Sequence, residues 1–437
     1  MILAEGMAEA SSQSQKSAAT PIYILRGHAS PIHALYIFSQ NLRLVSGDAD
    51  GWVVIWDLVT KRPVTVWKAH EGAVLEVKAF PMSEGGSEIY THGRDHKLCV
   101  WKLRKEDESF LDKTLPVDVA TSNKQENGTQ PWLLHSLPVN ALNFCAFSMI
   151  FIDIPTENNT SKEQNSKDTK SQDILFAVPN ALDSGGIDIF HLPSELRLTT
   201  IRSDPAIKTG MVMAVEIFTS ACGDIYVTSA YEDGHVMAFV RRGPVSADCL
   251  ELPKLSSNPW KWERLYVSRP HSQPVLSIDV PPSRDCFFSS SADALVVKHP
   301  IPSHATGGNG GEDLPLKTIN TKHSGQQGLR LRGDGRIFAT AGWDSRVRVY
   351  SGKTMKELAV LKWHKDGCYA VAFGQVETIF EPTSTNESEG QTQQKQTGLG
   401  HDFSLATVHN QRNQKVQQTH WLAIGSKDGK ISLWDIY

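Results

Sequence analysis

The sequence lacks a strong excess of charge of either sign, and it lacks closely spaced pairs of cysteines. Lys and Arg together number 44, Asp and Glu number 48, and the formal net charge is −4. This balance gives no electrostatic reason to expect direct contact with nucleic acid or with a membrane surface. The six cysteines lie far apart without a C-x-x-C pair, so neither a zinc site nor a disulfide framework is expected.

Long apolar runs and catalytic motifs are also missing. No stretch approaches the roughly 20 apolar residues that span a bilayer. The string GSKDGK at 425–430 is one residue short of a phosphate-binding loop and continues into an apolar strand pattern. We find no Ser/His/Asp or Cys/His arrangement and no cofactor fingerprint. The sequence therefore predicts no catalytic, metal or cofactor site, and it indicates a binding protein.

What the sequence does contain is an internal repeat. An Asp stands six residues before an aromatic residue or a His in six places, and a weaker seventh copy has Ser184 before Phe190. The six pairs are Asp50 with Trp56, Asp95 with Trp101, Asp233 with Phe239, Asp293 with His299, Asp344 with Tyr350, and Asp428 with Trp434. Short alternating or apolar stretches lie between these markers, which is typical of strands bounded by turns.

Each copy also begins with a marker residue, which is a histidine in all but one copy. Most copies have a Ser or Thr four positions before the Asp. The histidines are His28, His70, His135, His271, His323 and His364, and the fourth copy has Lys208 instead. The hydroxyl residues are Ser46, Thr91, Ser229, Ser289 and Thr340. Asn180 takes this position in the third copy and Ile424 in the seventh, so both copies depart from the pattern.

This pattern resembles the WD-repeat family, in which each repeat forms a four-stranded blade of a β-propeller. The resemblance implies an all-β, seven-bladed propeller as a single domain over 21–437. It also implies that His, Ser or Thr, Asp and an aromatic residue join the strands of a blade through hydrogen bonds. The structural network predicted in this way comprises His28, Ser46, Asp50, Trp56, His70, Thr91, Asp95, Trp101, Ser229, Asp233, His271, Ser289, Asp293, His323, Thr340, Asp344, His364, Asp428 and Trp434.

The last repeat needs an outer strand that its own sequence does not supply. Residues 21–26 (PIYILR) form an apolar, alternating stretch before the first histidine and belong to no earlier repeat. An exposed sheet edge is a liability in a folded protein. We therefore expect this stretch to complete the seventh blade and to close the ring.

Five stretches fit no blade, and residues 1–20 are expected to be a disordered tail. The five are 104–130, 150–172, 241–261, 300–314 and 376–419, and two of them contain low-complexity strings, from Thr156 and from Glu387, that are expected to be disordered. By blade topology all five connections open on one face. The opposite face, with its short turns, is therefore the expected docking surface.

Residues next to the repeat aspartates are expected to project from that docking face. Exposed Trp and Arg are enriched at binding hot spots, so Trp52, Arg94 and Trp343 are the candidate partner-binding residues. The alternative is that they are ordinary turn residues, or that a Trp packs on a neighbouring blade.

Longer strings are similar to a more specific family. They are TPIYILRGHASPIHAL from Thr20, KRPVTVWKAHEGAVLEV from Lys61 and GSKDGKISLWDIY from Gly425. They resemble the fungal ASTRA-associated protein 1 family, whose animal relative is G-protein-β-like protein 1. The resemblance implies a nuclear, non-enzymatic scaffold in the ASTRA complex, linked to chromatin remodelling and to maturation of phosphatidylinositol-3-kinase-related kinases. The implied partners are kinase-maturation cochaperones, RuvB-like ATPases and a kinase-related scaffold.

The alternative function is a generic intracellular WD-repeat scaffold, such as a substrate receptor of a ubiquitin ligase. WDSR at 343–346 matches the W-D-x-R box of such receptors, but it precedes the expected third strand instead of following it. A G-protein β subunit is disfavoured because residues 1–20 contain no heptad pattern for a γ chain.

Overall fold

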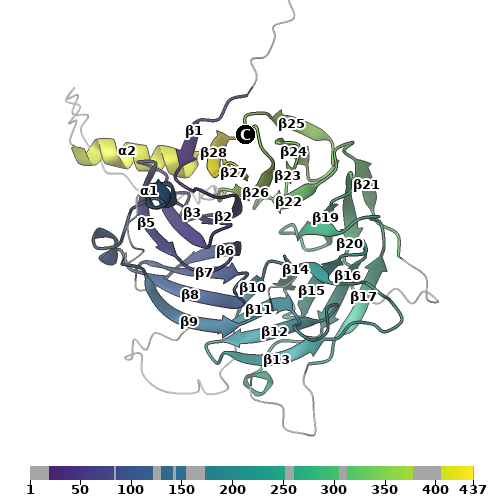
Figure 1. Ribbon diagram of the computed structural model, residues 1–437. Helices are drawn as coiled ribbons and strands as arrows, with labels where there is room; N and C mark the ends of the chain where they lie inside the picture. Colours follow the sequence, from purple (N-terminus) through teal and green to yellow (C-terminus); the bar gives the residue numbers. More distant parts are fainter. Residues whose placement is uncertain are drawn as a thin grey trace, which may run out of the picture.

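Seven four-stranded antiparallel sheets are arranged in a ring (Figure 1). A cavity lined by residues from all seven blades lies at its centre, and we call it the central channel. The computed structural model describes residues 19–82, 85–121, 129–140, 144–153, 173–250, 260–304, 313–376 and 405–436. Within these residues nearly all regular structure is β, and consecutive strands pair with each other. The predicted seven-bladed propeller is confirmed.

The first three blades follow the chain order from the channel outward. Blade 1 contains β2 (Ile32–Phe38), β3 (Arg43–Asp48), β4 (Trp52–Asp57) and β5 (Arg62–Lys68). Blade 2 contains β6 (Val74–Pro81), β7 (Ser87–Gly93), β8 (Lys97–Leu103) and β9 (Trp132–Pro138). Blade 3 contains β10 (Ser148–Ile152), β11 (Asp173–Pro179), β12 (Ile187–Leu192) and β13 (Leu196–Ile201).

Blades 4 to 6 repeat the same order. Blade 4 contains β14 (Val212–Thr219), β15 (Ile225–Tyr231), β16 (Val236–Arg241) and β17 (Glu263–Ser268). Blade 5 contains β18 (Val275–Asp279), β19 (Cys286–Ser291), β20 (Leu295–Pro300) and β21 (Lys317–Asn320). Blade 6 contains β22 (Gln326–Leu331), β23 (Ile337–Gly342), β24 (Val347–Ser351) and β25 (Glu357–Leu361).

Blade 7 is assembled from both ends of the chain. Its inner strands are β26 (Cys368–Phe373), β27 (Trp421–Ser426) and β28 (Lys430–Asp435), and its outer strand is β1 (Tyr23–Arg26). β1 pairs antiparallel with β28, with Leu25 opposite Ile431. Leu25 is buried in the cluster between blades 7 and 1. The predicted closure of the ring by residues 21–26 is confirmed.

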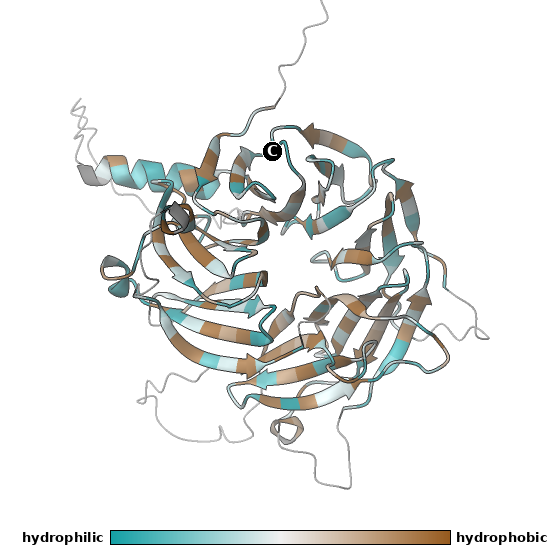
Figure 2. Ribbon diagram, viewed as in Figure 1, coloured by the Kyte–Doolittle hydropathy of each residue, from teal (hydrophilic) through white to brown (hydrophobic). Residues whose placement is uncertain are grey.

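The hydrophobic core lies between the blades. Seven clusters of buried side chains are found, one between each pair of neighbouring blades. Figure 2 shows many apolar residues along the strands. Successive residues of a strand point to opposite faces, so in β11 Ile174 and Phe176 pack against blade 2 while Leu175 and Ala177 pack against blade 4. The ring is therefore stabilised by a closed series of sheet-on-sheet contacts.

The inner strands of six blades share a local irregularity. Each shows a register shift that leaves one residue, just after the strand begins, without a partner of its own on the second strand. In blade 1 this residue is His33, between the paired Ile32 and Ala34. A β-bulge of this kind changes the direction in which a side chain points. In each of the six blades it occurs just after the first residue of the inner strand.

The two faces of the ring differ in their connections. One face has the short hairpins between second and third strands, and we call it the turn face. The long connections β10–β11 and β26–β27 join first to second strands, and β8–β9, β16–β17 and β20–β21 join third to fourth strands. All five therefore leave from the opposite face, which we call the insertion face. The low-complexity strings from Thr156 and Glu387, and residues 1–18 of the predicted tail, lie outside the described residues.

Three of these connections contain helical segments that the sequence did not predict. The β8–β9 connection has the 3-10 turn Asp107–Ser109 and α1 (Pro116–Thr121), and the β16–β17 connection has the 3-10 turn Ala247–Cys249. The β26–β27 connection ends in α2 (Leu405–Gln418). Neither described α-helix has the length and apolar character needed to cross a membrane.

Helix α2 is attached to the junction between blades 7 and 1. Val416 packs in the core cluster of this junction, and Trp421 Nε1 donates to its carbonyl at 2.8 Å. Asn41, in the β2–β3 turn, donates through Nδ2 to the carbonyls of Gln375 and Gln417, both at 2.9 Å. Asn41 also accepts from the Gln375 N–H at 2.6 Å. The insertion thus braces the place where the ring closes.

Candidate functional site

Blade 1 shows how the histidine network is built. His28 Nδ1 lies 2.7 Å from the Asp48 carboxylate, and His28 Nε2 lies 2.7 Å from the Ser46 hydroxyl. Trp56 Nε1 donates to the same hydroxyl at 2.9 Å. The relay joins the segment before β2 to β3 and β4. Because all its members are buried, each hydrogen bond also avoids the cost of an unsatisfied polar group.

The prediction that Asp50 belongs to this network is wrong. Asp48 takes its place because it ends β3 in a fully buried position, where its carboxylate also accepts the backbone N–H groups of Asp50 and Trp52 at 3.0 Å. Asp50 is exposed at the hairpin and accepts a hydrogen bond from the Ser30 hydroxyl. In blade 2 the position that corresponds to Asp48 is Gly93. Asp95, two residues later, is therefore the carboxylate that binds the histidine.

Blade 2 brings its four predicted residues together. His70 Nδ1 lies 2.9 Å from Asp95 Oδ1, and His70 Nε2 lies 2.8 Å from Thr91 Oγ1. Trp101 Nε1 donates to Thr91 at 3.0 Å. Burial opposes ionisation of Asp95, but its hydrogen bond with His70 holds the pKa of the carboxyl below its usual value.

Blade 5 brings together His271, Ser289 and Asp293, with a second histidine in place of the tryptophan. His271 Nδ1 lies 3.1 Å from Asp293 Oδ2, and His271 Nε2 lies 2.8 Å from Ser289 Oγ. His299 Nε2 lies 2.8 Å from the same hydroxyl. Burial, and the nearby His271, place the pKa of His299 well below its usual value.

In blade 6 the predicted His323 is not the residue that binds Thr340. Thr340 donates to Gln326 Oε1 at 2.7 Å, and Gln326 Nε2 donates to the His323 carbonyl at 2.9 Å. The ring of His323 is partly exposed, with Nδ1 3.5 Å from Asp344. Asp344 instead accepts from the Arg348 guanidinium at 2.6 Å. The amide of Gln326 replaces the imidazole because it supplies both a donor and an acceptor.

In blade 7 the hydroxyl lies on the other strand of the pair. His364 Nε2 lies 2.8 Å from Ser432 Oγ, and Trp434 Nε1 donates to the same oxygen at 2.8 Å. Ser432 is the cross-strand partner of Ile424, the residue at the expected hydroxyl position. His364 Nδ1 is 3.7 Å from Asp428, too long for a hydrogen bond. Burial lowers the pKa of His364 to about 4.

In blade 4 the predicted Ser229 and Asp233 have separate partners. Ser229 donates to the hydroxyl of Tyr231 at 3.0 Å. Asp233 lies 2.6 Å from Nδ1 of His235 in its own turn. Lys208, at the usual histidine position, is exposed. The missing histidine is therefore replaced by two local contacts.

Blade 3 has a different network altogether. Asn180 Nδ2 donates to the Asp188 carboxylate at 2.8 Å, and the Thr200 hydroxyl donates to the same group at 2.5 Å. Ser184, expected at the aspartate position, is not the acceptor of this network. The Asp188 carboxylate accepts the hydrogen bonds instead. His135, expected to begin the blade, lies instead in β9 of blade 2 and contacts Glu195 at 2.7 Å.

A second feature is a cavity at the centre of the ring. It encloses about 930 Å³ of space, part of it open to solvent, and it is lined by residues from all seven blades. We call seven of these residues, one from each blade, the channel ring: His33, Leu75, Phe144, Met213, Leu276, Gln327 and Tyr369. Six of them are the bulged residues of the inner strands, and Phe144 precedes β10. They lie where first strands begin, which is the turn face.

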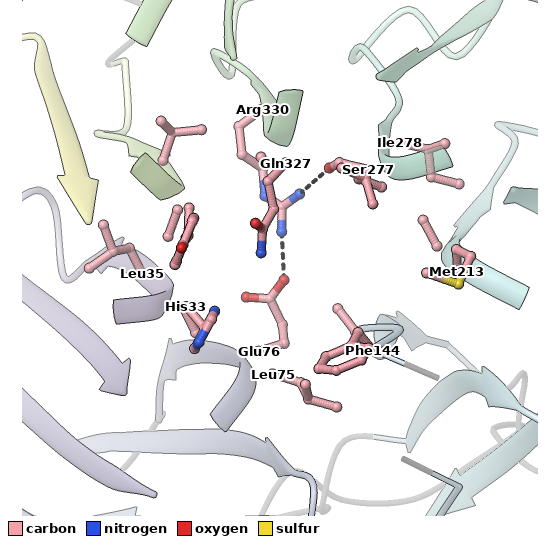
Figure 3. A pocket seen from close by; sticks show the side chains of 18 of the residues that line it. His33, Leu35, Leu75, Glu76, Phe144, Met213, Ser277, Ile278, Gln327 and Arg330 are labelled. Carbon is pink, nitrogen blue, oxygen red and sulfur yellow. Dashed lines mark hydrogen bonds and ion pairs between the residues drawn. The ribbon is translucent and has the colours of Figure 1, made fainter. Parts of the chain in front are cut away.

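The cavity contains a charged cluster beside this ring (Figure 3). Arg330 donates to Glu76 at 2.5 Å and reaches the Ser277 hydroxyl at 3.5 Å. Glu216 also lines the cavity and accepts a hydrogen bond from the Ser148 hydroxyl. Burial raises the pKa of nearby Asp279 to about 6, with Glu216 adding to the effect and Arg330 opposing it.

Two of the three candidate partner-binding residues contact the channel ring. The Arg94 guanidinium lies 4.1 Å from the centre of the Phe144 ring. Trp343 is 48% exposed, and its Nε1 donates to Gln327 at 2.7 Å. Trp52 is different, since it is partly buried and packs on the cluster between blades 7 and 1. WDSR at 343–346 lies in the β23–β24 turn.

Sequence reasoning missed Glu76, Glu216 and Arg330. The repeat pattern gives no signal for them, because it does not show which side chains meet across the centre of the ring. Among the described residues, no group of three or more His, Cys, Asp or Glu side chains is placed to hold a metal ion. The arrangement as described suits binding of a side chain or peptide at the channel mouth.

The sequence was compared with known proteins. It matches the family described as ASTRA-associated protein 1 over residues 21–434. A protein of that name from Penicillium rubens is 64% identical over 436 residues, covering 97% of this chain and 98% of the relative. The relative from Aspergillus niger is 58% identical, covering 99% of this chain and all of the relative. The relative from Schizosaccharomyces pombe is 32% identical, covering 81% of this chain and 93% of the relative.

Proposed function

Because the chain belongs to the ASTRA-associated protein 1 family, we propose that it is a non-enzymatic scaffold subunit of an ASTRA complex. The family relationship carries this proposal, since it extends over nearly the whole chain. The fold is consistent with it, because a closed propeller presents two broad faces to different partners. Fold alone would not identify the complex.

The proposed role is to hold partner proteins together in the nucleus. The partners we propose are RuvB-like ATPases, kinase-maturation cochaperones and a kinase-related scaffold. Through them the chain acts in chromatin remodelling and in the maturation of phosphatidylinositol-3-kinase-related kinases. Any nucleotide hydrolysis then belongs to the partners, and the purified chain is expected to hydrolyse no ATP.

The geometry favours the turn face for one of these contacts. Trp343 and Arg94 contact the channel ring through Gln327 and Phe144, so one surface combines exposed aromatic and guanidinium groups. Such groups dominate binding energy at many interfaces. The insertion face carries α2 and the long connections, and it is available to a second partner.

Affinity purification of the tagged full chain, followed by mass spectrometry, tests the proposal. We expect to recover RuvB-like ATPases and kinase-maturation cochaperones. A variant with Arg94→Ala and Trp343→Ala should lose at least one of them while keeping the wild-type melting temperature. Lys322→Ala, at an exposed site, is the control. Recovery of none of these proteins by the wild-type chain would contradict the ASTRA assignment, and a cytoplasmic signal in fluorescence microscopy would contradict the nuclear one.

A further inference from the structure

The charged cluster inside the central channel contains more carboxylates than ion pairs. Burial opposes the charge on Arg330, but Glu76, Asp279 and Glu216 around it together raise the pKa of its guanidinium. Two further cations lie on aromatic rings, Lys78 at 5.8 Å from the centre of the Phe147 ring and Arg94 at 4.1 Å from that of Phe144. Among the described residues only Glu76, of the three carboxylates, has a cation in ion-pair contact.

Glu216 and Asp279 form no ion pair among the described residues, and they differ in their other contacts. Glu76 has Arg330 at 2.5 Å. Asp279 accepts the backbone N–H groups of Leu331 at 2.6 Å and Val280 at 2.9 Å. Among the described residues Glu216 forms no ion pair, and its contact is the uncharged hydroxyl of Ser148. A half-buried carboxylate that faces a cavity is stabilised by an incoming cation.

We propose that the mouth of the central channel binds a Lys or Arg side chain of a partner protein, with Glu216 as the carboxylate that receives it. The proposal rests on the scaffold function proposed above and specifies the chemistry of one contact. The charge of Glu216 complements a cation, whereas an acidic side chain would meet Glu216 and find Arg330 already held by Glu76.

The channel ring suits the aliphatic part of such a side chain. Leu75, Met213 and Leu276 supply apolar surface to the cavity, and Figure 3 shows Leu75, Phe144 and Met213 along the wall of the cavity that contains the ion pair. A long basic side chain buries its methylene stem on apolar surface while its charged end makes polar contacts. The combination of an apolar rim and a carboxylate that has no ion pair therefore matches Lys or Arg better than a wholly apolar residue.

The rim also contains aromatic groups that accept a cation. Phe144 is 63% exposed and already carries the Arg94 guanidinium at 4.1 Å from its ring centre. Across the mouth His33 and Tyr369 stack in parallel, with ring centres 5.4 Å apart. Burial lowers the pKa of His33, so its ring is neutral at physiological pH and does not repel a cation. Aromatic faces attract guanidinium and ammonium groups.

A set of fluorescent nonapeptides tests the proposal on the full chain. The peptides share one sequence, and their central residue is Arg, Lys, norleucine or Glu. Fluorescence anisotropy should show the Arg or Lys peptide binding about tenfold more tightly than the norleucine and Glu peptides. Equal affinity for norleucine, tighter binding of Glu, or no binding of any peptide at millimolar concentration would each overturn the proposal.

Variants of the chain locate the binding site. Glu216→Gln should lower affinity for the basic peptide by about tenfold and leave the norleucine peptide unaffected. Glu106→Gln, at an exposed position in the β8–β9 connection, is the matched control. The melting temperature of each variant shows whether the ring is intact. Unchanged affinity of a folded Glu216→Gln chain refutes the site. Peptide selectivity without recovery of ASTRA proteins would reject only the proposed complex.

Discussion

Arg330 of blade 6 and Glu76 of blade 2 form an ion pair across the central channel, with Nη2 and Oε2 2.5 Å apart. The side chain of Glu76 is only 6% exposed. The two residues are 254 positions apart in the sequence, and blades 7 and 1 lie between theirs on the side where the chain ends meet. The ion pair therefore links blades 6 and 2, which flank the two blades where the ring closes.

Breaking this pair from one side should destabilise the fold. Arg330→Met leaves the Glu76 carboxylate buried without its partner, and such changes cost about 3–5 kcal/mol. Adding Glu76→Met should recover most of that loss, because no charge then remains buried. Urea unfolding followed by tryptophan fluorescence measures both. Arg336→Met, whose side chain is 83% exposed, is the control. A single variant as stable as the wild type would show that the pair does not brace the ring.

The two aspartates of the first hairpin should behave differently. Asp48→Asn weakens the bond to His28 and the hold on two backbone N–H groups, so we expect a loss of about 1–3 kcal/mol. Asp50→Asn changes an exposed contact and should stay within about 0.5 kcal/mol of the wild type. Chemical denaturation of both variants provides the comparison. The reverse order of effects would restore Asp50 to the network.

Asn41 should control the attachment of α2. Its side chain makes three hydrogen bonds to the β26–β27 connection, and its backbone has a φ of +65°. Asn41→Ala loses these bonds and disfavours that left-handed conformation, at a cost of about 2–4 kcal/mol. Asn41→Gly loses the bonds but keeps the conformation easily, so it should cost less than Ala. Hydrogen exchange over 405–418 should quicken in both, and unchanged protection would mean that other contacts hold the helix.

Acid should destabilise the protein partly through His92. Burial, with a contribution from His70, lowers the pKa of His92 to about 3, whereas an unfolded histidine titrates near 6.5. Between these values the unfolded chain binds the extra proton, so the free energy of unfolding falls as pH falls, by about 1.4 kcal/mol per pH unit for this group. His92→Asn should reduce the slope by that amount between pH 6 and about 4.

The control for the acid experiment is His420→Asn, at an exposed position. It shows what the loss of one exposed histidine does by itself to the stability of the fold. Urea titrations at a series of pH values measure the slope for all three chains. If His92→Asn retains the full wild-type slope, then the buried imidazole is protonated in the folded state at mild acidity and the prediction fails.

The sequence was informative where a contact lies within one repeat. His70, Thr91 and Asp95 stand at spacings that the blade geometry dictates, and the structure brings them together. The closing strand was predictable because its alternating apolar residues had no other partner. A short-range pattern determines the contacts of His70, whereas the closing strand was assigned by elimination, since its partner β28 lies far away in the sequence.

Substitutions inside the pattern were less predictable. Two aspartates, Asp48 and Asp50, compete in one hairpin, and only their burial in the folded blade selects the first. Gln326 replaces a histidine that is present nearby, and Ser432 supplies from β28 the hydroxyl expected from β27. Each solution preserves the donors and acceptors while changing the residue that carries them.

The channel was not predictable from the repeat. Arg330 and Glu76 lie in the inner strands of blades 6 and 2, and their contact crosses the ring. Spacing within a repeat contains no information about which blades face each other across the centre. The bulges that direct the channel ring inward also depend on the pairing of two strands, which is a property of the assembled sheet.

The pairing of β1 with β28 has a consequence for the folding of the protein during its synthesis on the ribosome. β1 is among the first segments to be made, yet its hydrogen-bonding partner is synthesised only after all six other blades. Domains fold as the chain emerges, so the nascent protein passes through an open arc in which Leu25 and Leu35 have not met Trp421 and Leu433. During that interval the two ends of the arc expose apolar surface, and a stall in translation late in the message would prolong their exposure to other chains.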